Sequence, residues 1–277
     1  MKFWKYHGIG NDFILFVDLQ KRLQLSKKKI VGLCDRHYGI GADGILILEQ
    51  SQDADAAMRI FNADGSEAEM CGNGIRCAAK HLYDFSIVRK EKMKIDTLSG
   101  VKEVRCIVQN EEVNEVIVNM GTPSLDCSSI PMKYDGQFIQ KIIDVGGRQI
   151  RGTAISMGNP HFVTFEELTP DEMRILGPLI ENHPIFPRRT NVEFARIDAK
   201  RIIVDVYERG AGWTLACGTG ACATAVAAAI AGLVKFDEDV EVRLPGGNLW
   251  VTVPKDLSSV TMRGPAVRVF VGEIELE

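Results

Sequence analysis

The sequence predicts an α+β fold made of two pseudo-symmetric lobes that arose by internal duplication. Two observations support this prediction: the same half-sized unit occurs twice, and each copy places one long apolar helix after a Cys-Gly-x-Gly turn. Runs of alternating or β-branched residues surround both helices and are typical of strands. We expect an N-terminal lobe of residues 1–118 and 264–277, which carries Cys71, and a C-terminal lobe of residues 119–263, which carries Cys217.

The duplication becomes visible when Cys71 is aligned with Cys217 and the halves are compared at that offset. Further segments then coincide in the same order: Ile60-Phe61 with Val206-Tyr207, Asn62 with Glu208, Gly72 with Gly218, and Gly74 with Gly220. Before this block, Gly10-Asn11-Asp12-Phe13 resembles Gly158-Asn159-Pro160-His161-Phe162. A preserved order of features indicates a repeated structural unit.

Each unit is expected to consist of strands around one apolar helix. The central helices are predicted at 73–84 and 219–233. The strands are predicted at 13–19, 44–49, 56–62, 92–98, 101–108 and 113–119, and then at 201–208, 239–244, 248–253 and 258–263.

Three further signals concern the ends of elements. A peripheral helix is expected to begin at Thr169, with Pro170 in its first position and Glu172 completing a capping box. Ser26 is expected to cap the corresponding helix of the first half. The segment 267–276 repeats no unit start, so we expect it to return and complete the first lobe.

The composition is that of a soluble globular protein with a full core: of 277 residues, 45% are hydrophobic and 25% charged. A net charge of −4 speaks against nucleic acid or an anionic membrane as a partner. The longest apolar stretch, 221–234, is too short to span a bilayer. Seven cysteines without a secretory signal favour a reducing compartment, so we expect a cytoplasmic protein.

Cys71 and Cys217 are the candidate catalytic residues, as general acid and base. Inversion of a stereocentre by removal and return of an α-hydrogen favours two groups on opposite faces, one basic and one protonated. The pseudo-symmetry is expected to bring the two helix starts face to face across a cleft between the lobes, which would hold the active site. A thiol at a helix N-terminus is expected to have a lowered pKa, so that thiolate forms near neutral pH.

The residues after each cysteine predict a site for the reacting carboxylate. Gly72-Asn73-Gly74 and Gly218-Thr219-Gly220 open the two helices with little bulk and present backbone N–H groups to an anion. Two helix N-termini directed at one α-carboxylate stabilise the charge of a carbanion. We therefore expect inversion of a small amino acid with no organic cofactor and no metal.

Other interpretations of these residues are weaker. The remaining cysteines are expected to be small buried side chains: Cys34, Cys77, Cys106, Cys127 and Cys222. Cys77 and His81 share a helix face, but no CxxC motif or His-rich set accompanies them as metal ligands. Residues 218–223 fit a loose dinucleotide fingerprint, but the turn before them is longer than in a Rossmann fold and the first copy ends in Cys77.

Motifs of a characteristic kind follow one another along the whole chain. They are Tyr6-His7-Gly8-Ile9-Gly10-Asn11-Asp12-Phe13, Phe61-Asn62-Ala63-Asp64-Gly65-Ser66, Met70-Cys71-Gly72-Asn73-Gly74-Ile75-Arg76-Cys77, Gly158-Asn159-Pro160-His161, Asn191-Val192-Glu193-Phe194, Tyr207-Glu208-Arg209-Gly210, and Thr214-Leu215-Ala216-Cys217-Gly218-Thr219-Gly220. This ordered set resembles the diaminopimelate epimerase family. The resemblance implies interconversion of LL- and meso-2,6-diaminopimelate, for lysine and peptidoglycan precursors, without pyridoxal phosphate. It also implies lobes that are each a β-barrel-like sheet around a central helix, and a homodimer.

The resemblance further implies roles for single residues. Cys71 and Cys217 are the acid and base, and His161 and Glu208 tune their pKa values. The backbone of Gly72, Asn73, Gly218 and Thr219 holds the reacting carboxylate. The remaining polar groups of the substrate are bound by Asn11, Asn62, Asn159, Asn191, Glu208 and Arg209. The distal end of diaminopimelate carries an ammonium, which suits Glu208, and a carboxylate, which suits the planar fork of Arg209.

One position departs from the family pattern. Many relatives carry Gln after Gly41-Ala42-Asp43, where this chain has Gly44, so a water or a neighbouring side chain is expected to replace that contact. The nearest alternative is a proline racemase or hydroxyproline epimerase, which also uses two cysteines. Those enzymes typically carry His in place of Asn73, and their substrates have no distal group for Arg209. A non-catalytic binding module, or a carbon–carbon isomerase of similar architecture, would not need both cysteines.

Overall fold

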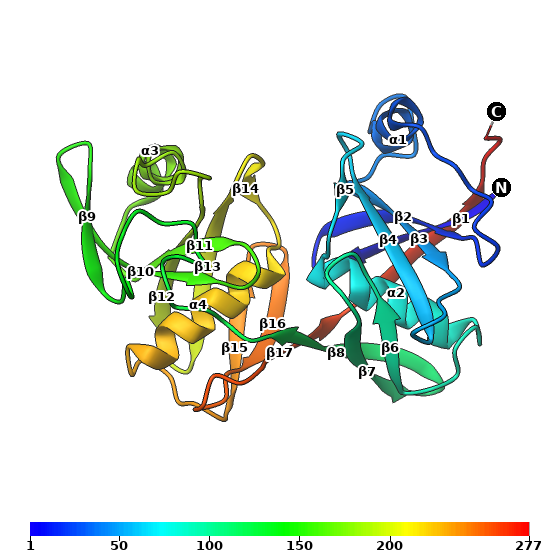
Figure 1. Cartoon of the computed structure of the whole chain (residues 1–277). Helices are drawn as coiled ribbons and strands as arrows, with labels where there is room; N and C mark the ends of the chain where they lie inside the picture. Colours follow the sequence, from blue (N-terminus) through cyan, green and yellow to red (C-terminus); the bar gives the residue numbers. More distant parts are fainter. Residues whose placement is uncertain (277) are drawn as a thin grey trace. The chain divides into compact units, whose positions relative to one another are not determined.

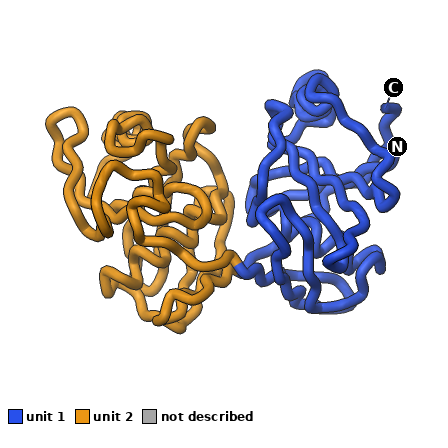
Figure 2. Tube along the Cα trace, viewed as in Figure 1, with its two compact units in different colours: residues 1–119, 263–277 blue, residues 120–262 orange. Residues whose placement is uncertain are grey.

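A computed structural model describes residues 1–276 and divides into two compact units, Met1–Asn119 with Arg263–Glu277 and Met120–Met262 (Figure 2). These bounds lie one residue from the lobe boundaries expected from the sequence. Unit 1 contains Cys71 and unit 2 contains Cys217. The chain leaves unit 1 within β8 (Glu112–Gly121) and re-enters it within β17 (Val260–Pro265).

Unit 1 consists of strands around helix α2 (Gly72–Asp84), with a second, shorter helix α1 (Lys27–Cys34) capped by Ser26 (Figure 1). Its strands are β1 (Lys2–Gly8), β2 (Asn11–Val17), β3 (Gly44–Glu49), β4 (Ala56–Asn62), β5 (Glu67–Ala68), β6 (Lys92–Asp96), β7 (Lys102–Gln109), the first part of β8, and β18 (Val267–Glu273). β1 pairs antiparallel with β2 and with β18, so the C-terminal segment completes this unit as expected.

Unit 2 repeats this plan around helix α4 (Gly218–Ile230), with α3 (Pro170–Glu181) as its second helix. Its strands are β9 (Lys141–Val145), β10 (Arg148–Ser156), β11 (Pro160–Thr164), β12 (Asn191–Asp198), β13 (Arg201–Glu208), β14 (Gly212–Thr214), β15 (Asp239–Leu244), β16 (Gly247–Thr252) and the first half of β17. The α+β composition predicted from the sequence is thus confirmed.

The order of strand pairings shows the duplication directly. In unit 1, β1 and β2 pair antiparallel, β2 and β3 parallel, β3 and β4 antiparallel, and β4 and β6 parallel. In unit 2, β10 and β11, β11 and β12, β12 and β13, and β13 and β15 pair in the same sequence of directions. Each parallel pair is joined by a crossover through a helix, as parallel strands require.

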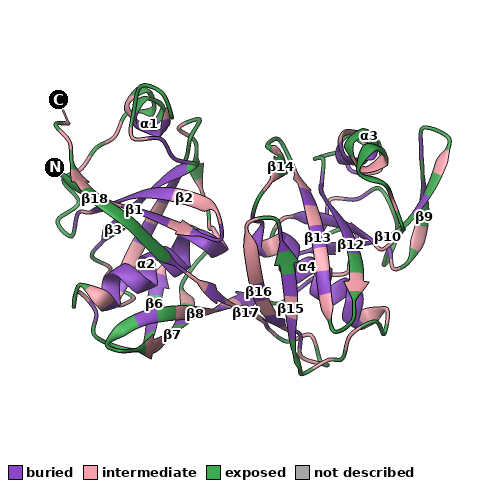
Figure 3. Ribbon diagram, turned by 180° about the vertical axis from the view of Figure 1, so that it is seen from behind, coloured by how far each residue is buried: buried purple, intermediate pink, exposed green. Residues whose placement is uncertain are grey.

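The central helices α2 and α4 are buried along most of their length (Figure 3). The small residues of α4 allow strands to pack closely around it, and the Thr224 hydroxyl is satisfied by the Gly220 carbonyl. This helix ends at Ile230 rather than at the predicted 233. Gly232 adopts a left-handed φ of 72° and donates to the Ala229 carbonyl, and Leu233 donates to the Ala228 carbonyl. These bonds form a glycine-terminated C-cap.

The predicted capping box of α3 is confirmed, with Thr169 and Glu172 exchanging hydrogen bonds ahead of Pro170. No helix within residues 1–276 is long and apolar enough to cross a membrane.

Candidate active site

In unit 1, Cys71 is the N-cap residue of α2. Its Sγ accepts a hydrogen bond from the backbone N–H of Gly74 over 3.4 Å. The first backbone bond of the helix runs from Ile75 N to the Cys71 carbonyl, so the N–H groups of Gly72 and Asn73 precede the intrahelical ladder. The sequence therefore sets a sulfur and two outward N–H groups on one helical turn, the arrangement expected for a thiol beside an anion site.

The Cys71 thiol also donates to Oδ1 of Asn11 at 3.7 Å, and the same oxygen accepts Nδ2 of Asn73 at 3.2 Å. Oδ1 of Asn73 in turn accepts Nη2 of Arg76 at 2.9 Å. Arg76 is fully buried and donates to the Gly72 carbonyl as well. This chain of bonds fixes which end of each amide faces the sulfur, and it brings three of the predicted site residues together.

Asn11 is held from its other side by a charged network. Its Nδ2 donates to Oδ2 of Asp43 at 3.0 Å, and Asp43 pairs with Arg36 at 2.7 Å. Arg36 also binds both oxygens of Asp12, which in turn contacts Lys5 at 2.6 Å. Burial alone would raise the pKa of Asp12, but hydrogen bonds from Arg36 and Lys5 outweigh it and hold that pKa well below its usual range.

Unit 2 contains the equivalent thiol. Cys217 is the N-cap of α4, and its Sγ accepts the backbone N–H of Gly220 at 3.3 Å. The Thr219 hydroxyl lies 3.5 Å from the same sulfur. Ala221 N to the Cys217 carbonyl is the first backbone bond of this helix, so Gly218 and Thr219 present their N–H groups as Gly72 and Asn73 do in unit 1.

Asn159 and His161 extend from this thiol into the unit. Nδ2 of Asn159 donates to the Thr219 hydroxyl at 3.3 Å, and Oδ1 of Asn159 lies 2.9 Å from Nε2 of His161. Nδ1 of His161 lies 2.6 Å from Oε1 of Glu193. His161 therefore reaches Cys217 through Asn159 and Thr219.

The pKa of Cys217 differs from the sequence-based expectation. A helix N-terminus was expected to lower it, but burial raises it well above its usual value, and the carboxylates of Glu208 and Glu193 raise it further. Hydrogen bonds from Thr219 and Gly220 act in the opposite direction and are outweighed. The resting form of Cys217 in this structure is therefore the thiol.

Strand β13 ends at Glu208, and Arg209 begins the loop that follows it. Oε1 of Glu208 accepts the Thr214 hydroxyl at 2.6 Å, and Nη1 of Arg209 donates to the Arg188 carbonyl at 3.3 Å. Asn191, which is buried, accepts the backbone N–H of Arg209 through Oδ1 and donates through Nδ2 to the Pro160 carbonyl. The structure thus places Asn191 as a brace for the backbone of Arg209.

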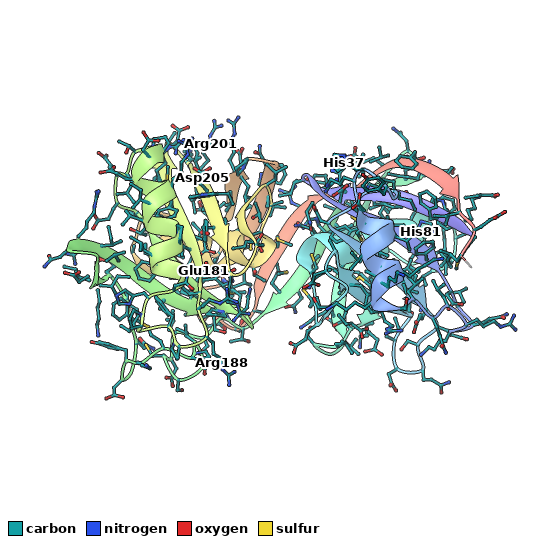
Figure 4. The ribbon with its side chains drawn as sticks, turned by 90° about the horizontal axis from the view of Figure 1, so that it is seen from above. His37, His81, Glu181, Arg188, Arg201 and Asp205 are labelled. Carbon is teal, nitrogen blue, oxygen red and sulfur yellow. The ribbon has the colours of Figure 1, made fainter. Side chains whose placement is uncertain are left out.

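Glu181, at the end of α3, braces the same loop (Figure 4). Its Oε1 accepts the backbone N–H of Gly210 at 2.7 Å and pairs with Arg189 at 3.2 Å. This buried carboxylate was not singled out by the sequence analysis. In the sequence, Glu181 lies at the end of a helix beside Asn182, and nothing in that position connects it with Arg209.

Asn62 and Gly44 lie at neighbouring strand ends in unit 1, where they are register partners. Asn62 is exposed and donates from Nδ2 to the Ser66 hydroxyl at 3.0 Å. Gly44 is buried, and a Cβ added there would lie 2.5 Å from the Phe61 carbonyl oxygen. A Cβ does not fit at position 44 unless the Phe61 backbone shifts, so this backbone disfavours the Gln expected from the family pattern.

Glu193 is the functional candidate that sequence reasoning missed. It lies within the quoted segment 191–194 but was assigned no role. The repeat offers a signal: by strand register Glu193 takes the place of Leu46 in unit 1, so a carboxylate replaces a core residue. Its burial is complete.

The weak metal alternative finds no support in the positions of its residues. Nδ1 of His81 is bonded to the Tyr6 hydroxyl at 3.1 Å, and its ring stacks on Phe85. Burial raises the pKa of Cys77 to about 12. Within residues 1–276 no cluster of three or more His, Cys, Asp or Glu residues is arranged to hold a metal ion.

Comparison with known proteins bears on the whole chain. The sequence profile described as diaminopimelate epimerase matches residues 3–125 and 153–269. A diaminopimelate epimerase from Pelotomaculum thermopropionicum is 48% identical over 280 aligned positions, which cover 99% of this chain and 98% of that protein.

Solved structures share the fold at low sequence identity. A probable proline racemase from Agrobacterium radiobacter has a TM-score of 0.74 at 14% identity, covering 100% of this chain and 93% of that one. A phenazine biosynthesis protein from Bacillus anthracis has a TM-score of 0.71 at 16% identity, covering 100% and 99%. These likenesses concern the fold alone, whereas the sequence matches extend across both cysteine turns. This chain belongs to the diaminopimelate epimerase family.

Proposed function

We propose that this chain epimerises 2,6-diaminopimelate, interconverting the LL and meso forms, with Cys71 and Cys217 as its two catalytic residues. One observation carries the proposal. In two units with the same strand order, the central helix begins at a cysteine whose sulfur accepts the N–H three residues on, at 3.4 Å for Cys71 and 3.3 Å for Cys217. The other five cysteines hold no such position.

The reaction needs two proton transfers, one from the α-carbon of the substrate to a sulfur and one from the other sulfur to that carbon. One cysteine, as thiolate, removes the α-proton of the substrate, and the electron pair of the broken C–H bond delocalises onto the adjacent carboxylate. The other cysteine, as thiol, donates its proton to the opposite face of the same carbon. The product has inverted configuration and the two sulfurs have exchanged protonation states. The raised pKa of Cys217 favours it as the initial proton donor, with Cys71 as the base.

Backbone N–H groups are proposed to hold the reacting carboxylate. Gly72 and Asn73 in α2, and Gly218 and Thr219 in α4, precede the first intrahelical bonds and so present donors at the positive ends of two helices. Negative charge that develops in the transition state is stabilised there, and one such donor contributes roughly 3 kcal/mol in known enzymes. This accounts for a reaction that proceeds without an organic cofactor or a metal.

The distal amino-acid group is assigned to the remaining polar residues. Glu208 suits the ammonium and Arg209 the carboxylate, and the two lie at the end of β13, close in sequence to Cys217. The amides proposed to complete this recognition are Asn11, Asn62, Asn159 and Asn191, the last by positioning Arg209. Glu208 also acts on the pKa of Cys217 through its charge, and His161 acts through Asn159, which supports their proposed tuning roles.

The test is solvent deuterium incorporation by the purified protein with no added cofactor. Incubation of LL-diaminopimelate in D2O should give meso product with one deuterium at the inverted α-carbon, measured by mass spectrometry and by chiral chromatography. Incorporation into proline but not into diaminopimelate would assign the chain to the proline racemase reaction instead. Absence of exchange with either substrate would overturn the proposed chemistry.

We also propose a cytoplasmic homodimer. None of the seven cysteines is in a disulfide, which favours a reducing compartment. Strand β18 carries a stripe of exposed apolar side chains, with exposed fractions of 43% for Val267, 56% for Val269 and 52% for Val271. A second copy of the chain covering this stripe would remove it from water.

Light scattering after size-exclusion chromatography tests the assembly. The wild-type chain should elute as a dimer at micromolar concentration, and V269D/V271D should be a monomer. Ile175→Asp, on the exposed face of α3, is the matched control and should remain dimeric. A monomeric wild-type protein would refute the proposal.

A further inference from the structure

Glu193 and His161 form a fully enclosed pair in unit 2. Both side chains have 0% exposed area, and Oε1 of Glu193 lies 2.6 Å from Nδ1 of His161. The second carboxylate oxygen, Oε2, has no hydrogen-bond partner within residues 1–276. A buried carboxylate with one empty oxygen is unfavourable unless the pair is neutral overall.

The hydrogen bonds of His161 define where its protons lie. Nε2 faces Oδ1 of Asn159 at 2.9 Å, and that oxygen can only accept, so Nε2 carries a hydrogen. The remaining proton lies between Nδ1 and Oε1 of Glu193. The pair therefore holds this proton and has no net charge, and burial of Glu193 raises its pKa in agreement.

The donor and acceptor roles set at His161 determine those of the hydrogen bonds that lead to the Cys217 sulfur. Because Oδ1 of Asn159 is taken by His161, its Nδ2 points to the Thr219 oxygen at 3.3 Å. That oxygen is then an acceptor toward Asn159, which leaves its hydrogen for Sγ of Cys217 at 3.5 Å. Each member of this series fixes the orientation of the next, and the last member is a donor aimed at sulfur.

Unit 1 provides an internal comparison. β2 and β3 pair with Phe13 opposite Gly44, and β11 and β12 pair with His161 opposite Asn191, so Phe13 corresponds to His161. Two residues along, Leu46 corresponds to Glu193. The two side chains occupy the same place beneath the helix: a Cβ at Gly74 would lie 3.0 Å from Leu46, and one at Gly220 would lie 2.9 Å from Glu193. The apolar residues Phe13 and Leu46 of unit 1 therefore correspond to His161 and Glu193 of unit 2, which hold a proton between them.

We propose that Glu193 is a positioning residue: by holding His161 it orients Asn159 and Thr219, so that the Thr219 hydroxyl donates to Cys217 as thiolate forms there. This inference rests on the proposed function. It makes the two half-sites unequal, because the amide that contacts Cys71, Asn11, is held by the Asp43 carboxylate rather than by an imidazole. The ionisable groups that face the pair are Glu208 on β13 and Cys217 at the start of α4.

Two substitutions separate positioning from simple charge. In Glu193→Gln the side-chain amide can donate to Nδ1 of His161, so Nε2 keeps its hydrogen and the series survives. In Glu193→Leu, which copies unit 1, His161 loses its anchor. We expect E193Q to retain kcat within about threefold and E193L to lose about tenfold to a hundredfold in kcat with little change in KM, the range seen when a catalytic group is misplaced.

The pH dependence of thiol alkylation gives a readout that needs no substrate. Iodoacetamide labelling of each cysteine, followed by peptide mass spectrometry, yields separate midpoints for Cys71 and Cys217 in one sample. Relative to E193Q, which also lacks the carboxylate, E193L should show a Cys217 midpoint about one pH unit higher because the thiolate loses a donor, while the Cys71 midpoint stays unchanged. Thr219→Val should raise the Cys217 midpoint similarly, and the double variant E193L/T219V should show no further rise.

The control is Glu166→Gln, which removes a carboxylate of the same unit that accepts from the Arg151 backbone and lies outside the series. It should leave both midpoints and kcat unchanged. Equal shifts of Cys71 and Cys217 in E193L, or a loss in E193Q as large as in E193L, would overturn the proposal. If the wild-type protein lacks activity on diaminopimelate, the alkylation midpoints still decide it, so failure of the function and failure of the positioning role are distinguishable.

Discussion

Nδ2 of Asn11 donates a 3.0 Å hydrogen bond to Oδ2 of Asp43. This bond determines the orientation of the Asn11 amide, because Nδ2 is occupied and Oδ1 must face Cys71 and Asn73. Asp43 is itself held by Arg36, so the loop that ends at β3 controls an amide beside the thiol of α2.

Removal of this carboxylate should therefore reduce activity more than stability. Asp43→Ala leaves the Asn11 amide able to rotate, and we expect kcat/KM to fall by about tenfold, since a hydrogen bond to a charged group contributes about 1.5 kcal/mol. Asp35→Ala is the matched control: its carboxylate accepts the backbone N–H groups of His37 and Tyr38 nearby, with no bond to Asn11. Steady-state kinetics with equal losses in both variants would show that loop stability, not amide orientation, is responsible.

The two candidate catalytic cysteines should each be indispensable. Cys71→Ser and Cys217→Ser keep the shape of the N-cap but replace an ionisable thiol by a hydroxyl that does not ionise near neutral pH. We expect kcat to fall by at least about 1000-fold in each, within the range of general acid–base catalysis. Cys106→Ala, at a buried position of strand β7, should retain full kcat. If one serine variant kept more than a tenth of wild-type activity, a two-thiol mechanism would be untenable.

Substitution at Gly44 should destabilise unit 1. An added Cβ would lie 2.5 Å from the Phe61 carbonyl oxygen, which is backbone and cannot rotate away. Gly44→Ala should lower the free energy of unfolding by about 1–3 kcal/mol, the usual range for overpacking, and Gly44→Gln by no less. Gly32→Ala in α1 meets no atom within 4 Å and should instead stabilise by about 0.5–1 kcal/mol. Urea unfolding of the three variants would refute this prediction if Gly44→Ala matched the wild type.

Much of the fold could be predicted from the sequence because local pattern and tertiary packing agree. The strands at 44–49, 56–62 and 201–208 form as predicted, since β-branched and apolar residues there are buried around the central helices. Strands β9 to β12 carried no assignment. In β10 the strand pattern is interrupted by Gly152, because the Phe162 ring occupies the space that a side chain at this position would need. This contact is tertiary, so the alternation of neighbouring residues does not reveal it.

From the residue pattern, without the family resemblance, the candidate site was predictable only where the duplication marked it. Cys71 and Cys217 stood out from the other cysteines because each recurs with the same glycines after it. Glu193 did not, because Asn191-Val192-Glu193-Phe194 has the alternation of a strand with one polar, solvated face. In the structure that face lies beneath α4, so Glu193 is buried. The alternation of residues in a strand does not reveal whether its polar face is covered by solvent or by a helix.

His81 should make the stability of unit 1 sensitive to acid. It is buried in α2 among Trp4, Tyr6 and Phe85 and is labelled in Figure 4. Burial, together with the charge of Arg268, lowers its pKa from 6.5 to about 3. Between those two values the unfolded chain binds one more proton than the folded chain at this site. Folding stability from His81 is therefore fully present above pH 6.5 and is lost as the pH falls toward 3.

The loss of stability should appear as a slope in the free energy of unfolding plotted against pH. One extra proton in the unfolded state lowers the free energy of unfolding by about 1.4 kcal/mol per pH unit. In His81→Gln this contribution is absent, so the wild-type curve should fall more steeply than the variant curve between pH 6 and pH 5, while His37→Gln on the exposed loop should follow the wild type. Chemical unfolding at half-unit pH steps measures the slopes. Parallel curves for wild type and His81→Gln would mean that His81 is already protonated in the folded core, a result that the unbonded Nε2 and the surrounding aromatic rings make unfavourable.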